Sequence, residues 1–302
     1  MNNIIAVIWD FDKTLVDGYM QDPIFEEYNV DAKSFWAEVN ALPEKYEKQN
    51  IKVNPDTIYL NHFIKYAKEG RFKGLNNAKL REFGKRLKFY KGVPEIFQKT
   101  QLITQTNKYK DHNIKVEHYI VSTGMSQIIK GSCVNEHVKG IWGCELIEGT
   151  DDNGNNIISE IGYTIDNTTK TRALFEINKG VGEIDGITVN TSIKKENRRV
   201  HFVNMIYVAD GPSDIPAFSV VNQNNGATFA VYPKGDMRAL KQVEAMRKEG
   251  RVNMFAEADY SKDSTAYMWL CAKIEELAEK IYAEEREKIM KAIGGTPPKH
   301  IV

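Results

Sequence analysis

Four short runs of apolar, mostly β-branched residues are spread along the chain and predict buried β-strands. The runs are Ile4–Trp9, Tyr119–Val121, Met205–Ala209 and Ala227–Tyr232. A run that is apolar at every position is typical of a strand covered on both faces of a parallel sheet. Helical patterns separate the runs. We therefore expect an α/β fold with a doubly wound, Rossmann-like parallel sheet.

The segment after the first strand has no strand pattern, and its apolar residues recur at helical spacing. We predict a small all-helical domain over residues 17–90, inserted into a core domain made of residues 1–16 and 91–302. The repeats are Phe35, Trp36 and Val39, then Ile58, Phe63, Ile64 and Ala67, then Leu80, Phe83 and Leu87.

Three further patterns lie in the second half of the chain. Alternating residues around an Asn153-Gly154 turn predict a β-hairpin over 138–164. Residues 264–293 predict one long helix with an apolar stripe, which either packs on the core or forms a homodimer contact. Residues 183–199 are polar and predict no regular element, and residues 294–302 predict a loose tail.

Composition narrows the class of protein. The chain has 302 residues, and its 41 Lys and Arg balance its 41 Asp and Glu, which argues against a nucleic-acid partner. No apolar stretch approaches the roughly 20 residues that cross a membrane. The amino terminus lacks the basic region of a secretory signal, and the three cysteines are scattered. We expect a cytoplasmic protein, either monomer or homodimer, with no membrane partner.

Polar residues follow three of the predicted strands at their carboxyl ends. Asp10 and Asp12 come directly after the first strand, and Asp210 and Asp214 follow Met205–Ala209. Ser122-Thr123-Gly124 ends the second strand. In an open α/β sheet, ligands bind beyond these ends, so we expect the residues to meet. Alone, the paired aspartates fit acids that cap a loop, and Ser122 fits a helix N-cap.

Several carboxylates at one edge of a sheet need a hard divalent cation, and Mg²⁺ fits a site with few carboxylates and a phosphate. Lys170 begins the predicted helix Thr171–Lys179. The helix dipole disfavours a cation at that end. We therefore expect Lys170 to neutralise a phosphate or the carboxylates, the alternative being a solvated lysine.

These motifs resemble the haloacid dehalogenase-like hydrolase superfamily, in its phosphoserine-phosphatase-like branch with a helical C1-type cap. The first motif, DxDx(T/V), is matched by Asp10, Asp12 and Thr14. Ser122 matches the second motif and Lys170 the third. Asp210 and Asp214 match the acidic fourth motif. The match runs from residue 4 to about residue 232.

The resemblance implies a two-step phosphoryl transfer through an aspartyl phosphate. Asp10 is then the nucleophile, and Asp12 protonates the leaving oxygen and later deprotonates a water. Ser122 and Lys170 bind the phosphoryl oxygens, with Thr123 and Gly124 beside them. The resemblance assigns Mg²⁺ to Asp10, the Asp12 backbone carbonyl and Asp210, with Asp214 in support. An acid at position 12 favours phosphate over haloacid substrates.

The chain departs from the family pattern where the substrate is recognised. Phosphoserine phosphatases carry an acid shortly after the first motif and an arginine in the cap. Tyr19, Met20 and Gln21 stand in that first region, and no arginine precedes Arg71. Lys13 stands where glycine is frequent. We therefore do not expect phosphoserine, but another small phosphorylated metabolite.

Two other functions use the same residues. A phosphomutase shares the aspartate pair of a phosphatase but returns the phosphoryl group to a sugar. A catalytically silent protein binds Mg²⁺ and phosphate without turnover. Four aromatic residues of the insert either line a substrate pocket or form the insert's own core: Trp36, Tyr59, Phe63 and Tyr66.

Overall fold

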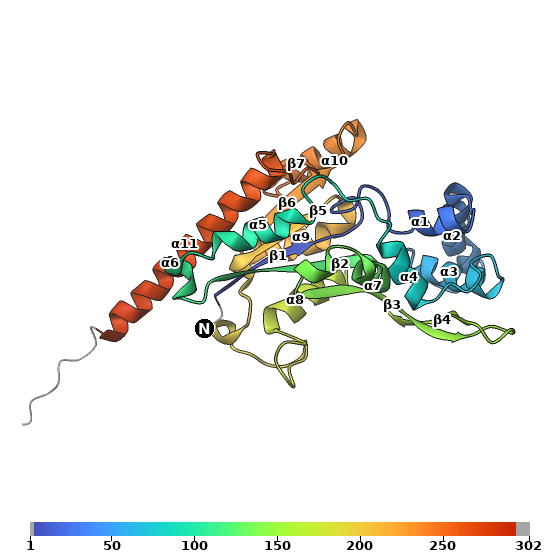
Figure 1. Ribbon diagram of the computed structural model, residues 1–302, viewed down its shortest axis with the longest axis horizontal. Coiled ribbons are helices and arrows are strands. Elements are labelled where there is room, and N and C mark those ends of the chain that lie inside the picture. The colour runs from blue at the N-terminus through green and yellow to red at the C-terminus, as the bar shows by residue number, and fades with distance from the viewer. Residues whose placement is uncertain (1–2, 294–302) are drawn as a thin grey trace, which may run out of the picture.

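The computed structural model describes residues 3–293 and contains one seven-stranded sheet (Figure 1). The strand order is β4-β3-β2-β1-β5-β6-β7. All neighbouring strands are parallel except β4, which pairs with β3 in antiparallel. The predicted α/β class is confirmed. The strands are β1 (Ile4–Trp9), β2 (Lys115–Met125), β3 (Gly140–Thr150), β4 (Asn156–Tyr163), β5 (Met205–Ala209), β6 (Ala227–Tyr232) and β7 (Met254–Glu257).

The helices cover both faces of this sheet, which explains why the central strands are apolar at every position. Along β1, alternate residues pack into two different cores. Ile5, Val7 and Trp9 belong to the core with α5 (Glu95–Ile103) and α11 (Thr265–Ile293). The intervening residues pack in the core with α8 (Lys170–Lys179), α9 (Ile215–Gln223) and α10 (Met237–Lys248). Two short helices, α6 (Asn107–Lys110) and α7 (Ser126–Gly131), flank β2.

The observed strands differ from the predicted runs in two places. β2 is longer than the predicted 119–121, because its first half mixes polar with apolar residues and so lacks a clear run. β7 was not predicted. It has only four residues, stands at the edge of the sheet and is partly exposed, so it lacks the apolar run of a central strand.

Four helices lie between β1 and α5 and gather at one end of the molecule (Figure 1). Their own core is aromatic, with Phe25, Phe35, Phe63 and Phe72 in mutual ring contact. The division into a domain over 17–90 and a core domain stays a prediction. The helices are α1 (Asp22–Glu27), α2 (Ala32–Glu47), α3 (Ile58–Lys68) and α4 (Asn77–Gly84).

The β3–β4 hairpin reaches alongside these four helices (Figure 1). The Ile158 amide donates a hydrogen bond to the Leu75 carbonyl at 2.8 Å, and the Asn77 amide donates to the Glu148 carboxylate at 2.7 Å. The hairpin therefore ties the helical insert to the sheet from the side.

The carboxyl-terminal helix α11 uses its apolar stripe within the chain. Leu270, Ile274, Leu277 and Ile281 are buried, and α11 packs against α5 and β7. This stripe is therefore covered by the chain itself rather than offered to a second copy. No helix within residues 3–293 is long and apolar enough to cross a membrane. The predicted tail, 294–302, lies outside the described residues.

A buried histidine fixes the sheet to α5. The Trp9 indole N–H donates to Nδ1 of His118 at 3.1 Å, so Nδ1 must be an acceptor. Nε2 lies 3.0 Å from the Thr100 hydroxyl, which itself donates to backbone carbonyls. His118 is therefore neutral with its proton on Nε2. Burial lowers the pKa of His118 to about 3.

This histidine is expected to make folding sensitive to acid. In the unfolded chain His118 becomes protonated below about pH 6.5, whereas in the folded protein it stays neutral down to about pH 3. The unfolded state therefore binds one more proton in this range, and the free energy of unfolding decreases as the pH is lowered. In the variant His118→Gln, the free energy of unfolding should decrease between pH 7 and pH 4.5 by about 2 kcal/mol less than in the unmodified protein, measured by urea unfolding. His112→Gln, at a partly exposed site, is the matched control. Equal pH slopes for both variants would contradict this assignment.

Candidate active site

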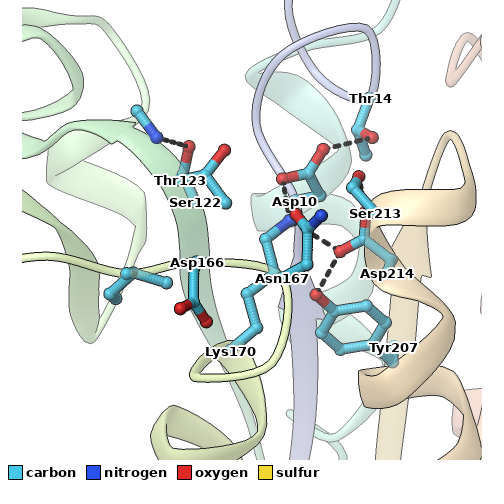
Figure 2. A network of polar contacts seen from close by, with 12 residues as sticks. Asp10, Thr14, Ser122, Thr123, Asp166, Asn167, Lys170, Tyr207, Ser213 and Asp214 are labelled. Atoms are coloured by element: carbon cyan, nitrogen blue, oxygen red, sulfur yellow. Dashed lines mark hydrogen bonds and ion pairs between the residues drawn. The ribbon is translucent and has the colours of Figure 1, made fainter. Parts of the chain in front are cut away.

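The carboxyl ends of three strands bring the predicted residues together in one place (Figure 2). Asp10 follows β1, Ser122 and Thr123 lie near the end of β2, and Asp210 follows β5. Asp214 ends the short 3₁₀ turn Pro212–Asp214, directly before α9. Adjacent pairing of β2, β1 and β5 places these ends side by side.

Lys170 forms the centre of the polar network. Its ammonium group donates to one carboxylate oxygen of Asp10 and one of Asp214, each at 2.7 Å. Lys170 is 1% exposed and Asp214 is 0% exposed. A buried lysine between two carboxylates is charged and neutralises part of their repulsion. Lys170 therefore stands at the amino end of α8 because the acids hold it there, despite the helix dipole.

The other hydrogen bonds of Asp10 and Asp214 fix both carboxylates. The Thr14 hydroxyl donates to Asp10 at 3.3 Å. The Tyr207 hydroxyl donates to Asp214 at 2.6 Å, and the Ser213 hydroxyl donates to its second oxygen at 2.9 Å. Both oxygens of Asp214 thus have donors within the protein.

Burial and mutual repulsion shift the titration of the acids. Burial, partly offset by Lys170, raises the pKa of Asp10 to about 6. Burial, with the Asp10 and Asp214 carboxylates nearby, raises the pKa of Asp210 to about 8. The pKa of Lys170 is raised by the same two acids, against the effect of burial. Ionising Asp10 and Asp210 together is therefore unfavourable at this edge of the sheet without further positive charge.

A divalent cation fits this group of acids. Asp10, Asp210 and Asp214 each offer an oxygen, and the three oxygens lie within 4.8 Å of one another. Among residues 3–293, no donor reaches the Asp210 carboxylate by a hydrogen bond, whereas Asp214 is fully engaged. An all-oxygen set with few free carboxylates matches the preference of Mg²⁺. Asp10 and Asp210 are the better candidate ligands, with Asp214 holding Lys170 beside them.

Asp12 is placed where an acid could meet a leaving group. Its carboxylate accepts a hydrogen bond from the Met20 amide at 2.8 Å, which fixes its orientation. Burial and the neighbouring Asp10 carboxylate raise the pKa of Asp12 well above its usual range. Asp12 therefore takes up a proton more readily than an ordinary aspartate, as suits an acid.

Two cavities meet at this acid. The smaller, of about 180 Å³, is lined by Asp10, Ser122, Lys170 and Asp210. The larger, of about 440 Å³, extends toward the helical insert. Asp12, Tyr19 and Thr123 line both cavities, so they lie at the junction. The geometry suits a substrate with a small anionic end and a larger organic end.

The predicted substrate-binding triplet 122–124 is divided between these cavities. Ser122 lines the smaller one, and its hydroxyl accepts a hydrogen bond from the Gly124 amide at 3.0 Å. Gly124 lines the larger one, and a side chain there would meet Met20 at 2.1 Å. The Thr123 carbonyl accepts a hydrogen bond from the Tyr59 hydroxyl at 2.9 Å, which links α3 to β2.

The four aromatic residues of the insert divide between the two predicted roles. Trp36 and Tyr59 line the larger cavity. Phe63 and Tyr66 are fully buried and pack with the other rings of the insert. Lys13 lines the smaller cavity, where its ammonium group lies 4.4 Å from the centre of the Tyr19 ring. Lys13 has a φ of 55°, a conformation that suits the glycine frequent in the family.

Sequence reasoning missed several residues of the site. Tyr207 looked like one more apolar residue of a buried strand, although a hydroxyl within MIYVA was a signal that it needs a polar partner. Asn40 and Asp56, which line the larger cavity, come from α2 and the loop before α3. Nothing in their local sequence sets them apart from exposed polar residues.

No protein-family model matches the chain. An uncharacterized protein of Borreliella burgdorferi is 39% identical over 286 residues, which cover 90% of this chain and 97% of that protein. The chain belongs to the same family as that protein.

Solved structures identify the fold. A hydrolase of the haloacid dehalogenase (HAD) family from Salmonella enterica serovar Typhi superposes with a TM-score of 0.52 at 13% identity, covering 89% of this chain and 70% of that one. The chain therefore has the HAD hydrolase fold. A phosphoserine phosphatase, in the form of its phospho-aspartyl intermediate analogue, is more distant: TM-score 0.46, 18% identity, 83% of this chain and 91% of that one.

The ion pairs of Lys170 are expected to support the fold as well as the site. Lys170→Met leaves two buried carboxylates without their cation, so the free energy of unfolding should fall by about 3 kcal/mol or more. The measurement is chemical denaturation in the presence of a chelator.

Lys130→Met is the matched control. Lys130 pairs with Glu145 at 2.6 Å, but both side chains are 35% exposed, so its loss should be below about 1 kcal/mol. Adding Asp10→Asn to Lys170→Met should restore part of the stability. Equal losses for the two lysine variants would show that the buried network does not stabilise the fold.

Proposed function

We propose that this protein is a Mg²⁺-dependent phosphomonoester hydrolase that acts through an aspartyl phosphate on a small phosphorylated metabolite in the cytoplasm. The observation that carries the proposal is the cavity lined together by Asp10, Asp12, Ser122 and Lys170, with Asp210 beside them. It offers a nucleophile, an acid and phosphate-binding groups around one space large enough for a phosphoryl group. The HAD hydrolase fold supports this reading.

In the first step, a carboxylate oxygen of Asp10 attacks phosphorus. The bond from phosphorus to the ester oxygen breaks, and Asp12 gives its proton to that oxygen, so the alcohol leaves neutral. The raised pKa of Asp12 supports this role because burial and the Asp10 carboxylate favour the protonated form of the group. Its position at the junction of the two cavities supports it as well.

In the second step, a water molecule attacks the phosphorus of the aspartyl phosphate. Asp12, now a carboxylate, takes a proton from that water, and the bond between phosphorus and Asp10 breaks. Inorganic phosphate leaves, and the Asp10 carboxylate and the Asp12 acid are restored. The covalent step divides one difficult displacement into two easier ones.

The remaining groups bind charge. The Lys170 ammonium and the Ser122 hydroxyl bind the phosphoryl oxygens, whose negative charge is spread in the transition state. Asp10, the Asp12 backbone carbonyl and Asp210 would hold Mg²⁺, which when bound supplies positive charge against the repulsion between carboxylate and phosphate. Asp214 and Tyr207 keep Lys170 in place.

The helical insert is proposed to act as a cap over this chemistry. The Asn54 amide donates to the Asp166 carboxylate at 2.8 Å, and the Asn167 amide donates to Asp56 at 3.3 Å. Asp166 and Asn167 lie in the loop that leads into α8, so these contacts join the insert to the segment that ends in Lys170, the first residue of α8. A cap closed in this way excludes bulk water from the phosphoryl group.

Phosphate release from p-nitrophenyl phosphate tests the proposal. The protein should release phosphate with Mg²⁺ and not with a chelator. Asp10→Asn should lower kcat by at least about a thousandfold, because the nucleophile is lost. Asp152→Asn, an exposed aspartate in the hairpin turn, is the control and should keep full activity.

Retained activity in Asp10→Asn would refute the nucleophile. Absence of release from the intact protein would refute the phosphatase. In that case, transfer between positions of a sugar phosphate would identify the mutase, and Mg²⁺ binding without turnover would identify the silent protein.

A further inference from the structure

This inference rests on the proposed function: in a phosphatase with this site, the larger cavity binds the leaving group and so selects the substrate. If the phosphoryl group occupies the space between Asp10 and Lys170, the alcohol portion extends past Asp12 into the cavity of about 440 Å³. The walls of that cavity come from the loop after β1, from α2 and from the start of α3. Most of these walls belong to the insert, whereas Asp12, Tyr19 and Thr123 are shared with the phosphate site and Gly124 comes from β2.

Gln21 gives this cavity an unmet hydrogen-bond acceptor. The residue is 4% exposed and lines the cavity. Its side-chain oxygen has no hydrogen-bond partner among the described residues. A buried acceptor without a donor is unfavourable. That oxygen is itself buried, so a ligand that brings an N–H or O–H group gains this hydrogen bond when the Gln21 side chain turns its amide toward the cavity.

The charges on the walls point the same way. Asp56 and Asp12 are carboxyl groups, and neither lysine nor arginine is among the described residues that line the cavity. The Asn167 amide donates to Oδ2 of Asp56 at 3.3 Å, a long hydrogen bond that leaves much of the carboxylate's acceptor capacity. A second carboxylate that reaches these walls would meet no cation there, because Lys13 lines the smaller cavity, with its ammonium group 4.4 Å from the centre of the Tyr19 ring.

The aromatic walls add an attraction for positive charge. The rings of Trp36 and Tyr59 lie 5.9 Å apart, centre to centre, and both line the cavity. The faces of such rings attract ammonium groups. An ammonium group would therefore meet rings, a carboxylate and an unmet amide oxygen in one space.

The first arginine of the insert along the chain is engaged elsewhere. The Arg71 guanidinium lies 3.6 Å from the centre of the Tyr66 ring and 3.8 Å from the Glu38 carboxylate. Arg71 does not line the cavity. It is therefore not available to bind the carboxylate of an amino-acid phosphate.

We propose that the larger cavity selects phosphate esters whose alcohol portion carries hydrogen-bond donors and no negative charge, a protonated amine being the best match. Gln21 and Asp56 accept the hydrogen bonds, and Trp36 and Tyr59 contact the cationic end. Amino-alcohol phosphates are the corresponding substrate class.

Two esters of equal length test this selection. Phosphoethanolamine and phosphoglycolate each have two carbons, and they differ in an ammonium against a carboxylate. The full-length protein with Mg²⁺ should show kcat/KM for phosphoethanolamine at least about tenfold above that for phosphoglycolate. Release from p-nitrophenyl phosphate is measured alongside, so a failure of the phosphatase itself is recognised separately.

Two variants assign the selection to the cavity. Gln21→Leu removes the acceptor, and Asp56→Asn removes the charge while keeping an oxygen for the Asn167 amide. In each, the ratio of the two kcat/KM values should fall about tenfold. Glu38→Gln is the matched control: it removes a carboxylate from α2 that faces His62 and Tyr66 rather than the cavity, and the ratio should not change.

The outcomes separate clearly. A preference for phosphoethanolamine that both variants weaken supports the proposal. Phosphoglycolate hydrolysed as well as phosphoethanolamine, or a ratio unchanged in both variants, overturns it. Hydrolysis of p-nitrophenyl phosphate without hydrolysis of phosphoethanolamine also overturns it. Absence of hydrolysis of the aryl ester by the unmodified protein refutes the phosphatase instead.

Discussion

The ion pairs of Lys170 are the interaction on which the rest of the site depends. Asp10, Asp210 and Asp214 lie close together at the edge of the sheet, where mutual repulsion and burial oppose their ionised forms. The buried ammonium group of Lys170, 2.7 Å from a carboxylate oxygen of Asp10 and of Asp214, offsets part of this repulsion. This one charge connects three segments: strand β1 through Asp10, the turn that ends with Asp214, and the helix that begins with Lys170.

The ion pairs of Lys170 also make the environments of the aspartates different from one another. Asp214 is committed to Lys170, Tyr207 and Ser213, while Asp210 has no donor within residues 3–293 and is free to meet a cation. Asp12 stands apart: the Met20 amide fixes its carboxyl group, and burial and the Asp10 carboxylate raise its pKa. Chemically similar aspartates thereby acquire different tasks, because their environments differ.

The helical insert supplies most of the larger cavity, which lies next to the acids at the sheet edge. The sheet edge supplies groups that suit any phosphate, and nothing at that edge distinguishes one alcohol from another. Gln21, Trp36, Asp56 and Tyr59 line the larger cavity next to Asp12, on segments that lie between β1 and α5. A family can therefore keep the reaction and change the substrate by altering these walls.

The apolar runs are enough to predict the central strands and the motif residues that follow them, because strands buried on both faces must be apolar throughout and the carboxyl ends of parallel neighbours meet at one edge. Which ionic partners form, and what lines the larger cavity, depends on how distant segments of the chain pack together. In the sequence Tyr207 resembles an ordinary core residue, but in the structure its hydroxyl donates to Asp214. Asp56 resembles an ordinary loop residue, but in the structure it lines the larger cavity. Such contacts join residues far apart in the chain, and no local pattern records them.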